Sequence, residues 1–293
     1  MSAEQNLLVL RRACNTSARV DASGLPRAPW RLDSSWAEER SNMARLQDRV
    51  ALITGAGNPV GRAVAQAFAE EGAHLVLQYD DVAQRPAINE LVRQIERLGR
   101  RAVALVMEIS SPNGAYMLTE AAVAGLGRVD ILVNNTGIRP AIPVVDTTAE
   151  QFDLVMAANV RSAFMITRMV LPLMFHQNYG RIVTTVSDIA YRGAPGYSLY
   201  GAAAGALLGF TRSLVHDIGL RNVTANCVAP GIIDPVVASE GERAALEAVR
   251  RALPSQRLGE LGDIVPSYVF LASDEARHMV GQCLSPSGGS VML

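Results

Sequence analysis

The sequence contains no lysine. All 27 basic side chains in the chain of 293 residues are arginines. The absence of lysine from the whole chain indicates a compositional bias toward arginine and alanine. It also excludes a lysine ammonium group from every site in the protein, because no lysine elsewhere in the chain can substitute for a missing one.

Cysteine is scarce as well. Cys14, Cys227 and Cys283 are far apart in the sequence, odd in number, and form no CxxC motif. This pattern predicts free thiols in a reducing compartment and argues against a structural zinc site. No metal is expected.

Neither sign of charge dominates, and long apolar runs are absent. The net charge of −1 offers no basic surface for nucleic acid and no polybasic membrane signal. No apolar run approaches the ~20 residues that are needed to cross a bilayer. With 49% hydrophobic and 19% charged residues, the composition fits an ordinary globular protein with a sizeable core. We expect a cytoplasmic protein that acts on a small molecule.

The first 45 residues differ from the rest. They mix arginines with acidic residues, contain turn formers, and carry two tryptophans, Trp30 and Trp36. A transit peptide is poor in acidic residues, and the apolar stretch at 7–10 is too short for a secretory signal. We interpret residues 1–45 as an N-terminal extension, either partly disordered or clasping a partner subunit, and residues 46–293 as a single domain.

From Leu46 onward, short apolar segments alternate with segments of helical periodicity. This alternation is typical of a parallel sheet with helices on both faces. It predicts a doubly wound α/β fold of the Rossmann type with a mostly seven-stranded parallel sheet. The expected strands cover about residues 49–54, 74–78, 102–107, 129–134, 181–186, 223–228 and 281–285.

Such a sheet binds its ligand at the carboxyl ends of its strands. The glycine-rich segment 54–61, Asn135, Ser187 and Pro230 all follow predicted strands. We therefore expect these separated positions to meet at one site.

Several motifs follow one another in a recognisable order. Ser187 precedes Tyr200 by thirteen positions, and the ordered set also includes the segments 49–55, 134–137, 230–231 and 270–274. The set resembles the classical short-chain dehydrogenase/reductase (SDR) family, and Gly281-Gln282 and Gly288-Gly289 resemble its FabG-like, 3-oxoacyl reductase members. The resemblance covers about residues 46–292 and implies the Rossmann fold.

The resemblance implies a catalytic set of Tyr200, Ser187 and Asn159. In the family the tyrosine exchanges a proton with the substrate oxygen, the serine bonds the same oxygen, and the asparagine helps to hold a relay water. The family's lysine, one helical turn after the tyrosine, is replaced here by Ala204. Loss of a cation ~4 Å away, worth about 4 kcal/mol at an effective dielectric near 20, raises the tyrosine pKa by roughly three pH units. Alcohol oxidation, which needs a base, is expected to suffer more than carbonyl reduction.

The resemblance also implies a nicotinamide dinucleotide, NAD or NADP. Its binding residues by this resemblance are Thr54, Gly55, Gly57, Asn58, Gly61, Asp80, Asn135, Gly137, Pro230 and Gly231. The middle glycine of the family loop is Pro59, which offers no N–H to a phosphate although proline suits the first turn of a helix. Binding is therefore expected to be weak or lost. Asp80 slightly favours NAD, because a carboxylate accepts from a ribose hydroxyl and repels a 2′-phosphate.

Other charged residues near these motifs have two interpretations. Arg139, Arg161 and Arg192 could each replace the missing positive charge, but each is also typical of a surface or loop arginine. Asp188 could be a general acid or base in a repurposed site, but a solvated loop aspartate is the more common case.

Three functions remain open at this point. An SDR-type oxidoreductase that reduces the carbonyl of a small or acyl substrate, through an atypical lysine-less site, is favoured. Pro59 and Ala204 both stand where the family contacts the cofactor, which supports a non-redox cyclase, isomerase or dehydratase instead. The third is a catalytically silent subunit that assembles with an active relative. The helices expected at about 147–175 and 198–218 resemble those through which family members form dimers and tetramers, so a homodimer or homotetramer is expected otherwise.

Overall fold

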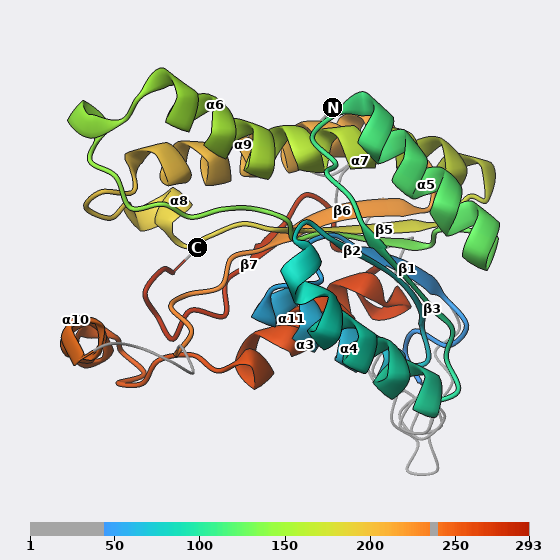
Figure 1. Cartoon of the computed structure of the whole chain (residues 1–293), viewed down its shortest axis with the longest axis horizontal. Helices are drawn as coiled ribbons and strands as arrows, with labels where there is room; N and C mark the ends of the chain where they lie inside the picture. Colours follow the sequence, from blue (N-terminus) through green and yellow to red (C-terminus); the bar gives the residue numbers. More distant parts are fainter. Residues whose placement is uncertain (1–43, 235–239, 293) are drawn as a thin grey trace, which may run out of the picture. The chain divides into compact units, whose positions relative to one another are not determined.

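The computed structural model of the chain describes residues 44–234 and 240–292. Within this part, seven strands form one parallel sheet in the order β3-β2-β1-β4-β5-β6-β7 (Figure 1). The strands are β1 (Val50–Ile53), β2 (His74–Tyr79), β3 (Ala102–Val106), β4 (Ile131–Asn134), β5 (Gly180–Thr185), β6 (Val223–Val228) and β7 (Cys283–Leu284). The predicted doubly wound α/β fold is confirmed. The predicted extension over residues 1–45 lies outside the described residues, except for its last two.

The strands are apolar because helices cover both faces of the sheet. Strands β1, β4 and β6 are buried along their whole length, as expected of central parallel strands. Strand β7, at the edge, is shorter than the predicted strand at 281–285. Edge strands have only one neighbour to bond, and a short one presents little unpaired backbone.

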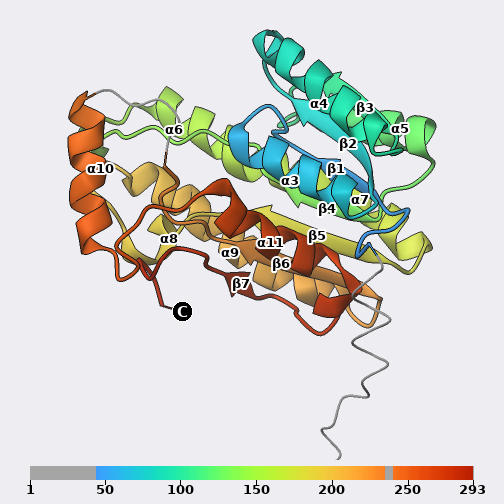
Figure 2. The same cartoon turned by 90° about the horizontal axis from the view of Figure 1, so that it is seen from below.

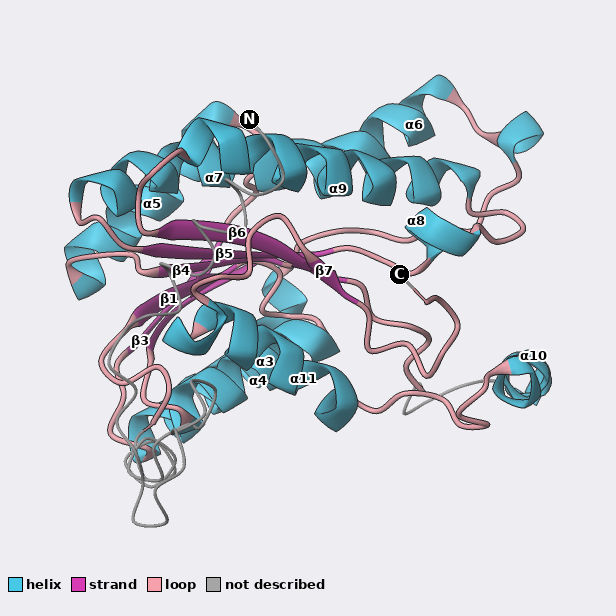
Figure 3. Cartoon of the chain, turned by 180° about the vertical axis from the view of Figure 1, so that it is seen from behind, coloured by secondary structure: helices cyan, strands magenta, loops and turns pink. Residues whose placement is uncertain are grey.

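Two layers of helices enclose the sheet. One layer contains α5, α7 and α9, and the other contains α3, α4 and α11 (Figure 3). A separate helix, α10, lies apart from both layers (Figure 2). The bounds are α3 (Pro59–Glu70), α4 (Arg85–Arg97), α5 (Pro112–Leu126), α6 (Ala149–Met156), α7 (Ser162–His176), α8 (Ile189–Arg192), α9 (Ser198–Ile218), α10 (Glu240–Ala252) and α11 (Leu261–Ala272).

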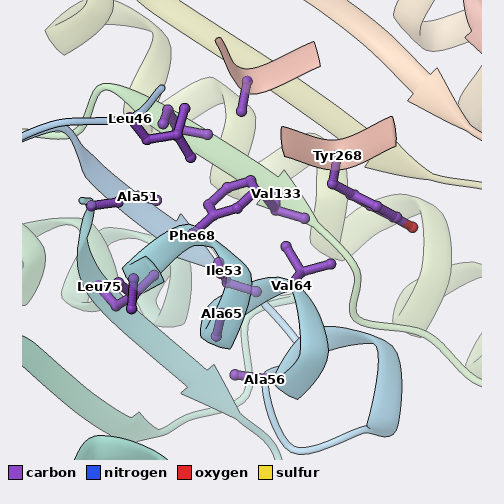
Figure 4. Packing of buried hydrophobic residues seen from close by; sticks show 14 of the residues in the cluster. Leu46, Ala51, Ile53, Ala56, Val64, Ala65, Phe68, Leu75, Val133 and Tyr268 are labelled. Atoms are coloured by element: carbon purple, nitrogen blue, oxygen red, sulfur yellow. The ribbon is translucent and has the colours of Figure 1, made fainter. Parts of the chain in front are cut away.

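The core on the α3 side is built around Phe68 (Figure 4). This side chain of α3 is fully buried in one cluster with Ile53 of β1, Val133 of β4 and Tyr268 of α11. Among these buried residues, only Tyr268 carries a hydroxyl group, which needs a hydrogen-bonding partner away from water. Helix α11 therefore brings a hydroxyl group into this layer, where Tyr79 of β2 carries another.

A long apolar helical stretch runs over Ala149–His176. By length and composition it could cross a membrane, whereas the sequence analysis found no apolar run of the necessary length. Its residues Ile166, Val170 and Met174 are fully buried against the other face of the sheet. We interpret the stretch as a core helix, and its apolar composition follows from this packing.

The same stretch is interrupted by a π-helical segment, Ala157–Arg161, between α6 and α7. Such wide turns are rare in helices and occur frequently at functional sites. Asn159 lies in the middle of this segment and is buried. The predicted long helix at about 147–175 is thus present, with a local widening at its one predicted site residue.

Candidate functional site

A pocket of about 450 Å³ lies where β1, β4 and β5 end. Five of the predicted site residues line it: Asn58, Asn135, Gly137, Asn159 and Tyr200. The chain changes sides of the sheet between β1 and β4, and a doubly wound sheet opens its ligand crevice at that point. The structure therefore brings together positions that are up to 142 residues apart, from Asn58 to Tyr200.

The other predicted positions do not line this pocket. They are Thr54, Gly55, Gly57, Gly61, Asp80, Ser187, Pro230 and Gly231. Their contacts, described below, hold the pocket walls in place. Most of them act on the backbone of the loops that follow the strands.

Tyr200 stands in the first turn of α9, and Ser187 follows β5. Burial raises the pKa of Tyr200 above the ordinary tyrosine value of 10.0, and a hydrogen bond with Ser187 acts in the opposite direction. The backbone N–H of Ile189 donates to the Ser187 hydroxyl at 3.2 Å, which fixes the position of that oxygen. At neutral pH the phenol is therefore protonated and can donate its proton.

The position one helical turn after Tyr200 holds only a methyl group. Ala204 is buried, with 3% of its surface exposed. Arg139 lines the same pocket, and its positive charge lowers the pKa of Tyr200. Its guanidinium carbon lies 5.8 Å from the centre of the Tyr197 ring, within cation–π range. Some positive charge therefore remains near the phenol.

The other two arginine candidates face elsewhere. Arg161 lines a separate hollow with Phe164 and Asp153. Arg192 donates from Nε to Oδ2 of Asp188 at 2.8 Å. Of the three arginines considered, Arg139 alone lines the pocket with Tyr200.

Asp188 has little capacity left for chemistry. Its side chain is 3% exposed, and it is paired with Arg192. The Ser290 hydroxyl donates to the same oxygen at 2.7 Å. The expected solvated loop aspartate is instead a buried aspartate that ties the C-terminal segment to the loop after β5.

Asn159 is held by its own amide. Nδ2 donates to the carbonyl oxygens of Ile138 at 3.0 Å and Val155 at 2.9 Å. The first of these bonds joins the π-helical segment to the loop after β4. Asn159 therefore supports the pocket wall as well as lining it.

The N-terminus of α3 offers few free N–H groups. Pro59 is its first residue and has no N–H. The N–H of Gly61 donates to Oδ1 of Asn58 at 2.8 Å, which caps the helix. Of the first three residues of α3, only Val60 keeps an N–H that could bind an anion.

Asn135 joins the loops after β1 and β4. Its Nδ2 donates to the carbonyl oxygen of Gly55 at 3.2 Å and to Oδ1 of Asn58 at 3.3 Å. Its backbone N–H donates to the hydroxyl of Thr54 at 3.0 Å. Gly55 has a φ of +62°, and a Cβ there would lie 2.8 Å from the Asn135 carbonyl oxygen, so both space and conformation require glycine.

Gln78, at the end of β2, is a structural residue that the sequence analysis missed. It is fully buried, accepts from the N–H of Gly55 at 2.9 Å, and donates to Oδ1 of Asp80 at 2.7 Å. Its Oε1 also accepts from the Thr136 hydroxyl at 3.1 Å. A glutamine within an apolar strand was the available signal, because a buried amide must have partners.

The remaining predicted positions have packing roles. A Cβ at Gly57 would collide with the side chain of Gln84, and one at Gly231 would lie 2.8 Å from Cα of Ser287. The carbonyl oxygen of Pro230 accepts from the N–H of Asp188 at 3.4 Å. These contacts set the path of the loops after β2 and β6.

Two further residues were missed. Thr185 lines the pocket, and its hydroxyl bonds the Tyr268 hydroxyl at 2.9 Å. Tyr268 is fully buried, and burial raises its pKa above the ordinary range.

No group of three or more His, Cys, Asp or Glu side chains that could hold a metal occurs in residues 44–234 and 240–292.

The chain matches known proteins over most of its length. Residues 55–290 match the family model described as Enoyl-(Acyl carrier protein) reductase. The chain is 32% identical over 248 residues to 3-oxoacyl-(acyl-carrier-protein) reductase FabG of Thermotoga maritima, covering 85% of this chain and 100% of that relative.

Solved structures are similar as well. A blue fluorescent protein from a metagenomic library, in complex with NADPH, is 34% identical with a TM-score of 0.79, covering 85% of this chain and all of the other. NAD+-bound xylitol dehydrogenase is 28% identical with a TM-score of 0.76, covering 84% of this chain and all of the other.

Proposed function

Because the chain belongs to the short-chain dehydrogenase/reductase family and is FabG-like, we propose that it reduces the carbonyl group of a small or acyl substrate with a nicotinamide dinucleotide. One observation carries this proposal. Tyr200 and Asn159 line the same pocket as the N-terminus of α3. A proton donor and a possible phosphate-binding helix end therefore share one cavity.

The pocket residues fit a nicotinamide dinucleotide, with fewer N–H donors than a glycine loop would give. Gly55 lets the backbone turn closely beside Asn135, and the Val60 N–H remains available for a phosphate oxygen. The Tyr200 end of the pocket would receive the nicotinamide. A reduced nicotinamide there would supply a hydride to the carbonyl carbon of the substrate.

The chain's own residues would handle the proton. Tyr200 gives its phenolic proton to the carbonyl oxygen as the carbon is reduced, so one alcohol forms and one tyrosinate remains. The hydrogen bond from Ser187 and the positive charge of Arg139 both stabilise that tyrosinate. Asn159, fixed through its two amide bonds, keeps the adjacent wall in place.

We expect a slight preference for NAD over NADP. The Asp80 carboxylate follows β2 and is oriented by Gln78. A carboxylate at this place repels a 2′-phosphate. The guanidinium of Arg62 donates to the Gly57 carbonyl and so is already engaged.

Titration calorimetry tests the proposal directly. The full chain is titrated with NADH and NADPH up to about millimolar concentration, where a Kd of 1 mM corresponds to −4.1 kcal/mol. Saturable binding is expected, tighter for NADH. Reduction of 3-oxoacyl thioesters and small ketones is then followed by loss of reduced nicotinamide absorbance, with Tyr200→Phe as the inactive control. If neither NADH nor NADPH binds, the proposal is overturned.

One observation favours a second function, a non-redox cyclase, isomerase or dehydratase. Pro59 and the Asn58 cap leave little at the start of α3 to bind a pyrophosphate. In that case Tyr200 would move protons without a dinucleotide. Turnover of a substrate in the absence of any nicotinamide, abolished by Tyr200→Phe, would favour this function over the reductase.

We further propose that the chain forms homo-oligomers. Phe152 and Leu154 of α6 and Phe164 of α7 are exposed, at 49%, 60% and 46%. Exposed apolar side chains on neighbouring helices are typical of subunit contacts. Light scattering after size-exclusion chromatography is expected to give a dimer or tetramer. A monomer that becomes active only with a related protein would support the silent-subunit alternative.

A further inference from the structure

A short hydrogen-bonded chain of three side chains leads from the core into the pocket. The Tyr268 hydroxyl lies 2.9 Å from Oγ1 of Thr185, and that atom lies 3.2 Å from Oδ1 of Asn135. Tyr268 is fully buried in α11, whereas Thr185 and Asn135 line the pocket. The three residues come from α11, the end of β5 and the loop after β4.

The direction of these hydrogen bonds follows from the Asn135 side chain. Its Nδ2 donates to the carbonyl oxygens of Thr54 and Gly55, so its Oδ1 is the atom that faces Thr185. That oxygen can only accept, so Thr185 must donate its single hydroxyl proton to it. Thr185 must therefore accept from the Tyr268 hydroxyl.

This arrangement leaves one lone pair on Thr185 without a partner among the described residues. A hydroxyl group has one proton and two lone pairs, and two of these three are used. The remaining lone pair belongs to an oxygen whose position and proton are both fixed. Thr185 is therefore prepared to accept one hydrogen bond and cannot donate another.

These three hydrogen-bonded side chains are also near the phenol of Tyr200. Tyr200 and Thr185 line the same pocket, and Tyr268 is near enough for a charge on Tyr200 to affect it. Ala204 follows Tyr200 by one helical turn, is buried, and contributes only a methyl group. The Thr185 hydroxyl is thus a neutral hydrogen-bond acceptor in a pocket where no lysine follows Tyr200.

We infer that Thr185, held by Tyr268 and Asn135, binds a hydroxyl group of the ligand in this pocket. The ligand is either the dinucleotide, through a ribose hydroxyl, or the alcohol product of the reduction. Tyr268 acts through Thr185 and is a positioning residue. The inference rests on the proposed function, because it needs a ligand that carries a hydroxyl beside Tyr200.

Thr185→Val tests the inference, because valine keeps the shape and removes the hydroxyl. Dinucleotide affinity is expected to fall about tenfold if the ribose is bound, and KM for the alcohol is expected to rise about tenfold if the product is bound. Thr184→Val is the matched control on the same strand, since its hydroxyl bonds Asn134 instead. The control should leave both quantities within about twofold.

A stability cycle separates binding from structure. Thr185→Val leaves the Tyr268 hydroxyl buried without its partner, so its Tm should fall by about 5 °C. Adding Tyr268→Phe removes that hydroxyl and should restore most of the Tm, while ligand binding stays weak. Restored binding in the double variant would show that Thr185 matters only for packing and would overturn the inference.

The remaining outcomes are also decisive. Wild-type protein that binds a dinucleotide, with both dinucleotide affinity and alcohol KM unchanged in Thr185→Val, refutes the role of Thr185 and leaves the reductase intact. Wild-type protein that binds no dinucleotide refutes the proposed function itself, and this inference with it.

Discussion

Gly137 lies directly against the amide oxygen of Asn159, so closely that a Cβ on the glycine would collide with that oxygen. Both residues line the pocket, one from the loop after β4 and the other from the π-helical segment. Asn159 is already bound to the carbonyl of Ile138, next to Gly137. The absence of a side chain at residue 137 therefore decides where Asn159 stands.

Gly137→Ala is expected to displace Asn159 and to lower kcat/KM for carbonyl reduction by about 100-fold, the scale of a misplaced positioning group. Steady-state kinetics of the purified variant measures this. Gly262→Ala is the matched control, because residue 262 is exposed in α11 with open space around it. Unchanged kinetics in Gly137→Ala would show that the position of Asn159 does not matter for the reaction.

Pro59→Gly restores an N–H at the first position of α3, and the dinucleotide Kd is expected to fall about tenfold, as for one added hydrogen bond to a charged group. Titration calorimetry measures the change. Pro112→Gly is a matched control, because Pro112 also opens a helix whose third N–H is capped, there by Ser111. If Pro59→Gly and Pro112→Gly bind equally, the proline at residue 59 does not limit affinity.

Ala204→Lys places an ammonium group one turn after Tyr200. It is expected to lower the pKa of Tyr200 by up to about three pH units and to raise the rate of alcohol oxidation more than that of carbonyl reduction. The pH–rate profiles in both directions measure this. Ala202→Lys adds the same charge at an exposed position of α9 and should leave the profiles unchanged. Since residue 204 is buried, Tm is recorded for both variants.

The pH dependence of the wild type follows from the raised pKa of Tyr200. Below the ordinary tyrosine value of 10.0 the phenol stays protonated, so the rate of carbonyl reduction should not fall as pH rises toward 10.0. Alcohol oxidation needs tyrosinate and should rise about tenfold per pH unit over the same range. The Tyr197→Phe variant should keep both pH dependences, whereas Tyr200→Phe should lose both carbonyl reduction and alcohol oxidation. A reductase rate that declines from neutral pH upward would contradict the assignment of Tyr200 as the acid.

Asp188→Asn is expected to affect stability and not the chemical step. The substitution leaves Arg192 without its buried partner, which lowers the free energy of unfolding by about 3 kcal/mol. Denaturant unfolding measures the loss, and the shape of the pH–rate profile should be unchanged. Arg192→Gln should show a similar loss from the other side of the pair. If Asp188→Asn removes the acidic or the basic side of the pH–rate profile, Asp188 acts as an acid or base in the reaction.

The sequence predicted the parts of the site that have local patterns. Apolar segments with helical periods between them predicted the parallel sheet, and the resemblance to the SDR family implied that Tyr200 and Asn159 share a site. Both line one pocket in the structure. Thr185 and Tyr268 have no such pattern and were missed, because they appear in the sequence as ordinary members of a strand or helix. Gln78 was missed although a glutamine within an apolar strand was a signal. Their roles come from partners that are distant in the sequence, as Tyr268 is from Thr185, 83 positions away.

The pairing of Asp188 with Arg192 was also missed, although the two residues are only four positions apart. Asp188 and Arg192 were separate candidates in the sequence, and the fold neutralises each with the other. Cys227 and Cys283, far apart in the chain, are in register on β6 and β7, and both are free thiols. A hydrogen bond from Cys227 lowers the pKa of Cys283 to about 7. No spacing rule could have brought Cys227 and Cys283 together.

The sequence by itself determined the sheet, the family and the absence of a lysine beside Tyr200, because these depend on residue type and on periods of a few residues. Only the tertiary structure decided which groups share the pocket with that phenol, among them Arg139 with its charge and Thr185 with its fixed lone pair. The physical reason is that electrostatic and hydrogen-bonding interactions depend on distances in space. Those distances are set when strands and helices from the whole chain pack into one core.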